Sequence, residues 1–336
     1  MKEFIAKVVD RQNLTESETV SAFDTIMSGE ATPAQIGALL TALRMKGETV
    51  DEIVGGASSM RRHAVRIDTG GAPVVDTCGT GGDGLNTFNI STTAALVVAG
   101  AGVPVAKHGN RAISSRCGSA DLLAALGIQI EVAADVVEQC IQEAGFGFLF
   151  APRLHPAMKH AMGPRREMGI RTLFNMLGPL TNPAGAKAQL IGVFLPELTE
   201  TFARVLQRLG SRRAFVVHGH DGMDEITTTT TTRVSELRDG QVRTYELDPL
   251  DFVDRASRLD ELAGGSPDDN AHIAREILSG KASPQRDIVC LNAAAAIVAG
   301  GKADTMVNGW RLAGEAIDSG RAADVLKRVI TITQAG

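Results

Sequence analysis

Several features that identify common classes of protein are scarce or missing in this sequence of 336 residues. Aromatic residues are few, with one Trp, one Tyr and 11 Phe, so there are few platforms on which single-stranded nucleic acid could stack its bases. Positive charge is not in excess either, because 34 Lys and Arg stand against 39 Asp and Glu, a net charge of −5. The totals therefore exclude a general attraction for nucleic acid or for an anionic membrane.

The sequence also lacks a C-x-x-C motif and a long apolar run. Its four cysteines, at positions 78, 117, 140 and 290, are typical of reduced thiols in small buried positions. The first residues contain no signal-like apolar segment, and the longest apolar run, about 92–106, is broken by glycines and Pro104. We therefore expect a cytoplasmic protein with no membrane-spanning segment.

What the first 65 residues contain is the pattern of three short amphipathic helices. In each, a threonine and the side chain three positions later form a capping box, which satisfies free backbone N–H groups. The three boxes are Thr15-x-x-Glu18, Thr32-Pro33-x-Gln35 and Thr49-x-x-Glu52. Three such helices need another surface against which to bury their apolar faces, either the rest of the chain or a second subunit. Residues 68–73, rich in glycine, predict the linker that follows.

From Val74 onward, short apolar strands alternate with helices, which predicts an α/β fold with a mostly parallel sheet flanked by helices. The strands are expected at 74–78, 103–106, 127–131, 147–151, 189–194, 213–218 and 242–247. The helices are expected at 91–101, 119–126, 134–144, 198–209, 270–279, 287–299, 304–319 and 321–329. In such sheets, ligands bind at the carboxyl ends of the strands.

The most informative stretch runs from Val74 to Ser119 and contains two glycine-bearing loops at the ends of expected strands. The first loop has glycines at 79, 81, 82 and 84, and packed glycines let backbone N–H groups approach an anion closely. A helix N-terminus at Ser91 adds further N–H groups. The second loop, Lys107-His-Gly-Asn-Arg111, adds positive charge. Together they predict a site for a phosphate or pyrophosphate group.

Gly79 to Gly84 also matches the G-x-G-x-x-G pattern of dinucleotide-binding proteins, which is weak alone. In that fold the last glycine leads directly into the helix, and an acidic residue follows the next strand. Here residues 85–90 intervene, and the next expected strand leads to Lys107 and His108. A dinucleotide site is therefore rejected.

Two later segments complete the expected site. Residues 155–183 are rich in basic side chains and predict a crossing between the helical and α/β parts, where Arg165 and Arg171 suit a carboxylate ligand. Asp224 and Glu225 follow an expected strand, and adjacent carboxylates beside a pyrophosphate site suit Mg²⁺. The run of six threonines at 227–232 predicts extended or loop structure.

Taken together, the motifs resemble those of the anthranilate phosphoribosyltransferase family, in order and spacing, from about residue 4 to 330. They are Gly79-Thr-Gly-Gly-Asp83, Asn89-Ile-Ser-Thr92, Lys107-His-Gly-Asn-Arg111, Gly118-Ser-Ala-Asp121, His155-Pro-Ala-Met158, Arg171-Thr-x-Phe-Asn-x-Leu-Gly-Pro-Leu-Thr-Asn-Pro183 and Asp224-Glu225. The threonine run departs from the family pattern. The resemblance implies transfer of the 5-phosphoribosyl group from phosphoribosyl pyrophosphate to the amine of anthranilate, a step of tryptophan biosynthesis that uses Mg²⁺.

The resemblance also implies an organisation into a helical domain, 1–70, with part of 165–185 packed on it, and a larger α/β domain, 71–336. The family forms homodimers through the helical domain, and the same is expected here.

The family's site residues transfer to this sequence as expectations. Phosphoribosyl pyrophosphate would contact Gly79, Gly82, Asp83, Thr87, Asn89, Ile90, Ser91, Thr92, Lys107, His108, Gly109, Asn110, Arg111, Ala112, Ile113, Ser114, Ser115 and Ser119. Anthranilate would contact Gly79, Asn110, His155 and Arg165, and Mg²⁺ would bind Ser91, Asp224 and Glu225. Lys107, Asn110 and Arg165 are the residues expected to act in catalysis.

Two alternatives share the expected architecture. A pyrimidine nucleoside phosphorylase would bind free phosphate and a uracil-like ring, but the segment 155–183 does not resemble its pattern. A non-catalytic nucleic-acid-binding relative would need a basic groove and would lose the metal carboxylates. The net charge of −5 and the intact Asp224-Glu225 pair oppose that alternative.

Overall fold

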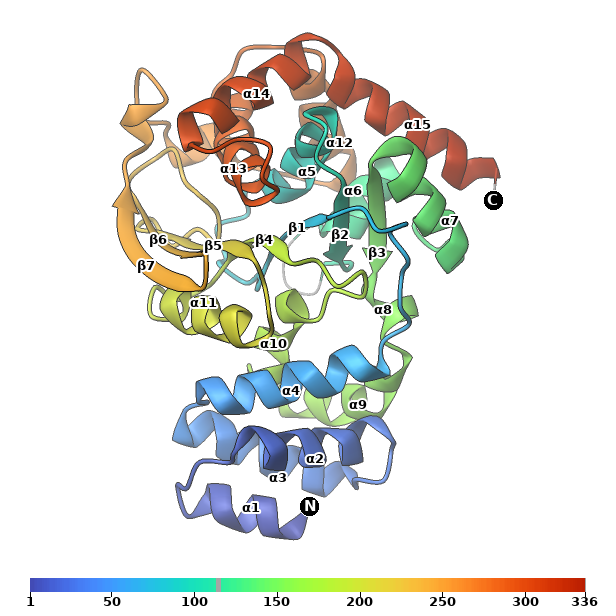
Figure 1. Cartoon of the computed structure of the whole chain (residues 1–336), viewed down its shortest axis with the longest axis vertical. Coiled ribbons are helices and arrows are strands. Elements are labelled where there is room, and N and C mark those ends of the chain that lie inside the picture. The colour runs from blue at the N-terminus through green and yellow to red at the C-terminus, as the bar shows by residue number, and fades with distance from the viewer. Residues whose placement is uncertain (113–115, 336) are drawn as a thin grey trace.

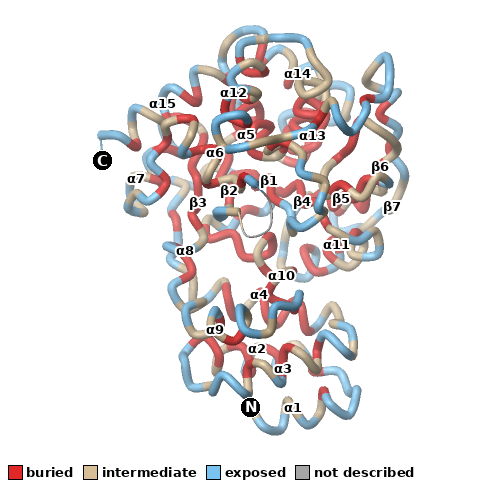
Figure 2. Tube along the Cα trace, turned by 180° about the vertical axis from the view of Figure 1, so that it is seen from behind, coloured by how far each residue is buried: buried red, intermediate tan, exposed pale blue. Residues whose placement is uncertain are grey.

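The computed structural model describes residues 1–112 and 116–335. A small helical part lies at one end of the molecule and a larger α/β part at the other, with the chain's N-terminus in the former and its C-terminus in the latter (Figure 1). Buried segments run through both parts and continue between them along α4 and α10 (Figure 2).

The helical part contains the first four helices and a later segment of the chain. Its helices are α1 Lys2–Val9, α2 Glu16–Met27, α3 Pro33–Lys46, α4 Val50–His63, α9 Lys159–Met168 and α10 Leu173–Leu177. The three predicted capping boxes are all present, with both hydrogen bonds of each. The later segment packs on the first, because α9 contacts α2 and α3 while α10 contacts α3 and α4.

The described residues of the larger part form one seven-stranded sheet of order β3-β2-β1-β4-β5-β6-β7. Its strands are β1 Val75–Gly79, β2 Val105–Gly109, β3 Phe146–Phe150, β4 Ala188–Gly192, β5 Arg213–Gly219, β6 Thr232–Arg238 and β7 Gln241–Leu247. The first five strands pair in parallel, and β6 and β7 add an antiparallel edge. Successive side chains face opposite sides, so Leu190 packs in one core cluster and Ile191 in another.

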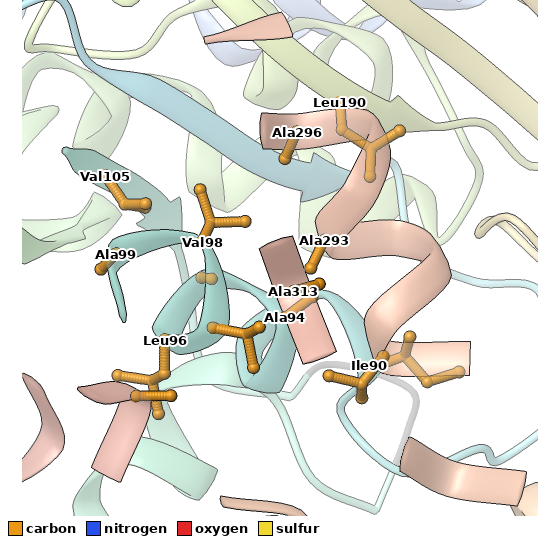
Figure 3. Packing of buried hydrophobic residues seen from close by; sticks show 14 of the residues in the cluster. Ile90, Ala94, Leu96, Val98, Ala99, Val105, Leu190, Ala293, Ala296 and Ala313 are labelled. Atoms are coloured by element: carbon orange, nitrogen blue, oxygen red, sulfur yellow. The ribbon is translucent and has the colours of Figure 1, made fainter. Parts of the chain in front are cut away.

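Helices cover both faces of the sheet. The remaining helices are α5 Ile90–Gly100, α6 Ser119–Ala125, α7 Ala134–Gln139, α8 Ala151–Leu154, α11 Leu198–Arg208, α12 Pro267–Leu278, α13 Pro284–Ala299, α14 Met306–Asp318 and α15 Arg321–Ala335. Helices α5 and α13 pack against one face, and alanines such as Ala94 and Ala293 allow the two to approach closely (Figure 3). Helix α11 packs with the helical part on the other face. The buried α5–α13 pair therefore gives rigid support to the loops at the end of the sheet.

The predicted fold class is confirmed, with some corrections to individual elements. Residues 127–131 form no strand, although Ile128 and Ile130 are buried as a strand pattern would require. Strand β6, missing from the prediction, begins at the last of the six threonines. A separate first helix, α1, precedes the three that were expected.

Among the described residues, no helix combines the length and the apolar character that crossing a membrane requires.

Candidate active site

The carboxyl ends of the parallel strands face the helical part, and a cavity of about 510 Å³ lies between the two. Its sheet side is lined by the ends of β1 and β2, including Gly79, His108 and Asn110. Its helical side is lined by residues of α4, α9 and α10, among them Arg165 and Phe174. The two parts of the chain therefore enclose one site.

The glycine loop that follows β1 is held from two sides. The amide of Gly81 donates a hydrogen bond to Asp224 Oδ2 over 2.8 Å, and the carbonyl of Gly82 accepts one from Arg171 Nη2 over 2.5 Å. A Cβ at Gly79 would lie 2.6 Å from Asp224 Oδ2, so glycine is required there for close approach. Arg171, considered as a carboxylate ligand from the sequence, instead contacts this loop and stacks on Phe194, with 4.5 Å to the ring centroid.

Asp224 and Glu225 lie on the loop between β5 and β6, where Asp224 contacts the first glycine loop and Glu225 contacts the start of α5. Glu225 Oε1 accepts a hydrogen bond from the amide of Ser91, at the start of α5, over 3.1 Å. Burial and the neighbouring carboxylate of Asp83 raise the pKa of Asp224 to about 7. Burial and Asp224 raise the pKa of Glu225 to about 8. Asp224 therefore lies close to the carboxylate of Asp83 and to that of Glu225, at the edge of the glycine loop.

This arrangement fits Mg²⁺ that is shared with a substrate. Within residues 1–112 and 116–335, no group of three or more His, Cys, Asp or Glu side chains is placed to hold a metal ion. Mg²⁺ does not need such a group, because it usually binds one or two carboxylates, water and substrate phosphates. A divalent cation would relieve the repulsion that raises the pKa values of Asp224 and Glu225.

Lys107 is buried beneath the site, with 2% of its surface exposed. Its ammonium group donates hydrogen bonds to the carbonyl and, over 3.4 Å, to the hydroxyl of Thr77. Burial lowers the pKa of Lys107, and the nearby carboxylates of Asp76 and Glu225 oppose this. Lys107 thus lies against Thr77 in β1, beneath the strand that leads into the glycine loop.

His108 and His155 form a buried pair in the wall of the cavity. Their Nε2 atoms lie 3.1 Å apart, and His108 Nδ1 lies 3.1 Å from the carbonyl oxygen of Gly178. Burial, aided by His155, lowers the pKa of His108 to about 3, and burial lowers that of His155 to about 4. Both rings are therefore neutral at pH 7.

Arg165 lies in the cavity wall on α9, and among the described residues it has no ion-pair partner. Its guanidinium lies over the ring of Phe174, 5.1 Å from the centroid, and Nη1 contacts Met162 Sδ at 3.9 Å. Burial lowers the pKa of Arg165. An arginine held this way can bind a ligand carboxylate through two hydrogen bonds.

Several other predicted residues lie around the same two loops but already have protein partners. The Asn89 side chain contacts Cys117 O at 3.0 Å and Asn270 Nδ2 at 2.9 Å. Arg111 pairs with Asp121 and Glu131, and Ser119 Oγ donates to Asn110 O over 3.2 Å. Thr87 forms a β-bridge with Ala263. Ile90 and Thr92 are buried at the start of α5. Gly109 ends β2, and Ala112 directly follows the second loop. Ile113, Ser114 and Ser115 lie outside the described residues.

Asp76 and Asn182, which were not among the predicted site residues, support the second loop. Asp76 Oδ1 accepts from the amide of His108 over 3.1 Å, and Asp76 Oδ2 accepts from Asn182 Nδ2 over 2.8 Å. Asn182 also donates to Ala106 O over 2.8 Å. Two sequence signals pointed to them: Asn182 belongs to the motif that ends at Pro183, and Asp76 is an acidic residue inside an apolar strand, which is unusual because a buried carboxylate needs partners.

Models of known families match both parts of the chain. Residues 2–64 match the helical bundle domain of the glycosyl transferase family, and residues 71–323 match its a/b domain. The chain is thus a two-part glycosyl transferase.

Individual relatives show which family of glycosyl transferases the chain belongs to. The anthranilate phosphoribosyltransferase of Moorella thermoacetica is 59% identical over 330 residues, which cover 98% of this chain and 97% of the relative. The crystal structure of the Thermus thermophilus enzyme of the same name superimposes with a TM-score of 0.94 at 44% identity, covering 98% of this chain and 99% of that one. The Saccharomyces cerevisiae enzyme, in complex with PRPP and Mg, gives a TM-score of 0.90 at 30% identity over 99% and 98% of the two chains. The chain belongs to the anthranilate phosphoribosyltransferase family.

Proposed function

We propose that this protein transfers the 5-phosphoribosyl group of phosphoribosyl pyrophosphate to the amine of anthranilate, giving N-(5-phosphoribosyl)anthranilate and pyrophosphate. One observation carries the proposal: a single cavity has Arg165, without an acidic partner among the described residues, on its helical wall and the glycine loop on its sheet wall. The first suits the carboxylate of an aromatic acid, and the second suits a pyrophosphate. The structure of the yeast relative in complex with PRPP (phosphoribosyl pyrophosphate) and Mg supports the proposal that this chain binds the same ligands.

Catalysis in this site depends on position and charge. The aromatic amine of anthranilate is neutral at pH 7 and needs no base to become nucleophilic. Arg165 and Asn110, on opposite walls of the cavity, hold the acceptor so that its amine faces C1 of the ribose. The bond between C1 and the pyrophosphate oxygen breaks as the C–N bond forms, and the amine loses one proton.

The negative charge of the leaving pyrophosphate is met by the glycine loop. Its backbone N–H groups and the positive dipole end of α5 lie at the ends of β1 and of the following loop. The charge of Lys107, buried beneath β1, favours the same anion. The other contacts to phosphoribosyl pyrophosphate that the sequence predicts are also part of this proposal.

Asp224, Glu225 and Ser91 would hold Mg²⁺ together with the substrate. The cation would supply positive charge to the pyrophosphate oxygens as the bond to C1 breaks. Ser91 is placed for this role because its amide already contacts Glu225.

The protein is proposed to act as a cytoplasmic homodimer through its helical part. Large apolar side chains are exposed there on two elements: Val9 at the end of α1 and Met45 on α3. Val9 is 63% exposed and Met45 is 70% exposed, which favours a covering partner.

Product analysis tests the function. Mass spectrometry of a reaction with anthranilate, phosphoribosyl pyrophosphate and Mg²⁺ should detect N-(5-phosphoribosyl)anthranilate and equimolar pyrophosphate. A parallel reaction of thymidine or uridine with phosphate should leave the nucleoside intact. Release of a free base from those nucleosides, with no anthranilate product, would favour a pyrimidine nucleoside phosphorylase instead.

A further inference from the structure

The loop that carries Asp224 and Glu225 is supported from below by Asn292, a polar residue in an apolar stretch of α13. Asn292 has none of its surface exposed and precedes four alanines. Its Oδ1 accepts a hydrogen bond from the amide of Ile226 over 2.9 Å, and its Nδ2 donates to the carbonyl of Ile226 over 2.8 Å. Both backbone groups of the residue after Glu225 are therefore fixed by one side chain.

Hydrogen bonds to Asp221 hold the same loop together from within. Asp221 Oδ2 accepts hydrogen bonds from Thr227 Oγ1 over 2.7 Å and from Thr229 Oγ1 over 2.5 Å. Asp221 Oδ1 accepts from the amide of Met223 over 3.0 Å. Residues before and after the two carboxylates are thereby joined through one side chain, and the unexplained threonine run supplies the donors.

Alternate threonines of the run face in different directions. Thr227 and Thr229 contact Asp221, whereas Thr228 Oγ1 donates to Ser257 Oγ over 2.9 Å. Thr228 is as buried as Thr227, yet its hydroxyl is directed to Ser257 and away from Asp221. The run therefore contains both candidate positioning residues and a matched control.

The loop that carries Asp224 packs closely against the ends of two strands. A Cβ on Gly192, at the end of β4, would overlap the backbone of Asp224, and one on Gly79 would press on its carboxylate. Asp224 thus lies between two strands that approach it only because they end in glycine. A small shift of the loop would change where both carboxylates point, and metal affinity is sensitive to such shifts.

We propose that Asn292 and Asp221, the latter through Thr227 and Thr229, are positioning residues that hold Asp224 and Glu225 in the geometry for a divalent cation bound with phosphoribosyl pyrophosphate. They touch neither substrate nor cation. The inference rests on the proposed function, because it assigns these residues to the metal carboxylates of that site.

The test measures metal binding directly, with Mn²⁺ as the probe and electron paramagnetic resonance as the readout, in the presence of phosphoribosyl pyrophosphate. Asn292→Leu removes the contacts to Ile226 at nearly constant volume, and Asp221→Asn weakens the contacts to the threonines. Thr229→Val is a milder variant that keeps Asp221. Thr228→Val is the control, since it deletes an equivalent hydroxyl on the side of Ser257.

We expect Asn292→Leu and Asp221→Asn to weaken Mn²⁺ binding by about 10- to 100-fold, and Thr229→Val to weaken it measurably. The KM for anthranilate should stay within about twofold of the original, as should Mn²⁺ affinity in Thr228→Val. Should Asn292→Leu fail to fold, the Mn²⁺ affinities of Thr229→Val and Asp221→Asn still test the positioning role. Unchanged Mn²⁺ affinity in the folded variants would overturn the inference alone. Absence of Mn²⁺ binding to the unaltered protein would overturn the proposed metal site and this inference with it.

Discussion

The Nε2 atoms of His108 and His155 lie 3.1 Å apart, and together with the contact of His108 to Gly178 this determines which of the facing ring nitrogens carries a proton. The carbonyl of Gly178 only accepts hydrogen bonds, so His108 Nδ1, 3.1 Å away, is the donor there. In a neutral ring, His108 Nε2 is then an acceptor, and the proton between the rings belongs to His155 Nε2. Protonation of His108 Nε2 would set two N–H groups against each other, so the contact requires His108 to stay neutral.

The first prediction concerns pH. The folded-state pKa values of His108 and His155, about 3 and about 4, lie below the ordinary value near 6.5. Between pH 6.5 and 4 the unfolded chain therefore binds more protons, and the free energy of unfolding falls as the pH falls. From pH 7 to pH 5 each histidine should account for a loss of about 2 kcal/mol.

Urea unfolding at the two pH values measures this loss. The variant His155→Gln should lose at least about 2 kcal/mol less than the original protein between pH 7 and pH 5. The exposed His272 on α12 gives the control, and His272→Gln should behave like the original. An equal loss in His155→Gln and in the original would contradict the buried neutral pair.

The second prediction separates the two substrates. Arg165→Ala removes an arginine of the cavity wall that has no acidic partner within the described part of the chain. The KM for anthranilate should therefore rise about 10- to 100-fold, because this factor corresponds to the free energy of a hydrogen bond to a charged group. The KM for phosphoribosyl pyrophosphate should change by less than about threefold. Arg166→Ala, which alters the exposed neighbouring residue, is the control. Equal increases of both KM values would count against the role of Arg165.

The third prediction is a variant that weakens the binding of phosphoribosyl pyrophosphate and not that of anthranilate. Arg171 Nη2 donates to Gly82 O in the glycine loop, so Arg171→Ala should loosen that loop. Steady-state kinetics should show a rise of about 3- to 10-fold in the KM for phosphoribosyl pyrophosphate. The KM for anthranilate should hardly change. A selective loss of anthranilate binding would instead assign Arg171 to the acceptor.

The fourth prediction concerns close packing at the end of β1. Gly79→Ala places a methyl group 2.6 Å from Asp224 Oδ2 and must displace that carboxylate. The Mg²⁺ concentration for half-maximal rate should therefore rise by about tenfold or more. Gly163→Ala on α9 is the control, because nothing in the described structure lies within 4 Å of its added Cβ. An unaltered Mg²⁺ requirement in Gly79→Ala would separate Asp224 from the metal.

Local patterns in the sequence were sufficient for most of the fold. The capping boxes at Thr15, Thr32 and Thr49 determined three helix starts, because a cap involves residues only three positions apart. The wrong strand at 127–131 had the right burial, but no strand among the described residues pairs with it. Strand β6 was missed because its pattern is not a regular alternation: Val234 and Ser235 are both buried, and Arg233 and Glu236 lie three positions apart.

The site was predictable only where its residues adjoin one another in the chain. The glycine loop, Lys107 to Arg111 and the Asp224-Glu225 pair could be found as motifs. The contacts that orient them join residues far apart, such as Asp76 with Asn182 and Asn292 with Ile226. No local pattern encodes these pairs, since they depend on how the sheet and helices pack.

The central claim is most directly tested by the fluorescence of anthranilate. The purified protein is mixed with anthranilate and phosphoribosyl pyrophosphate, with Mg²⁺ or with excess EDTA, and the signal is followed over time. The account predicts a rapid loss of fluorescence with Mg²⁺ and none with EDTA. A constant signal from folded protein in the presence of both substrates and Mg²⁺ would contradict it.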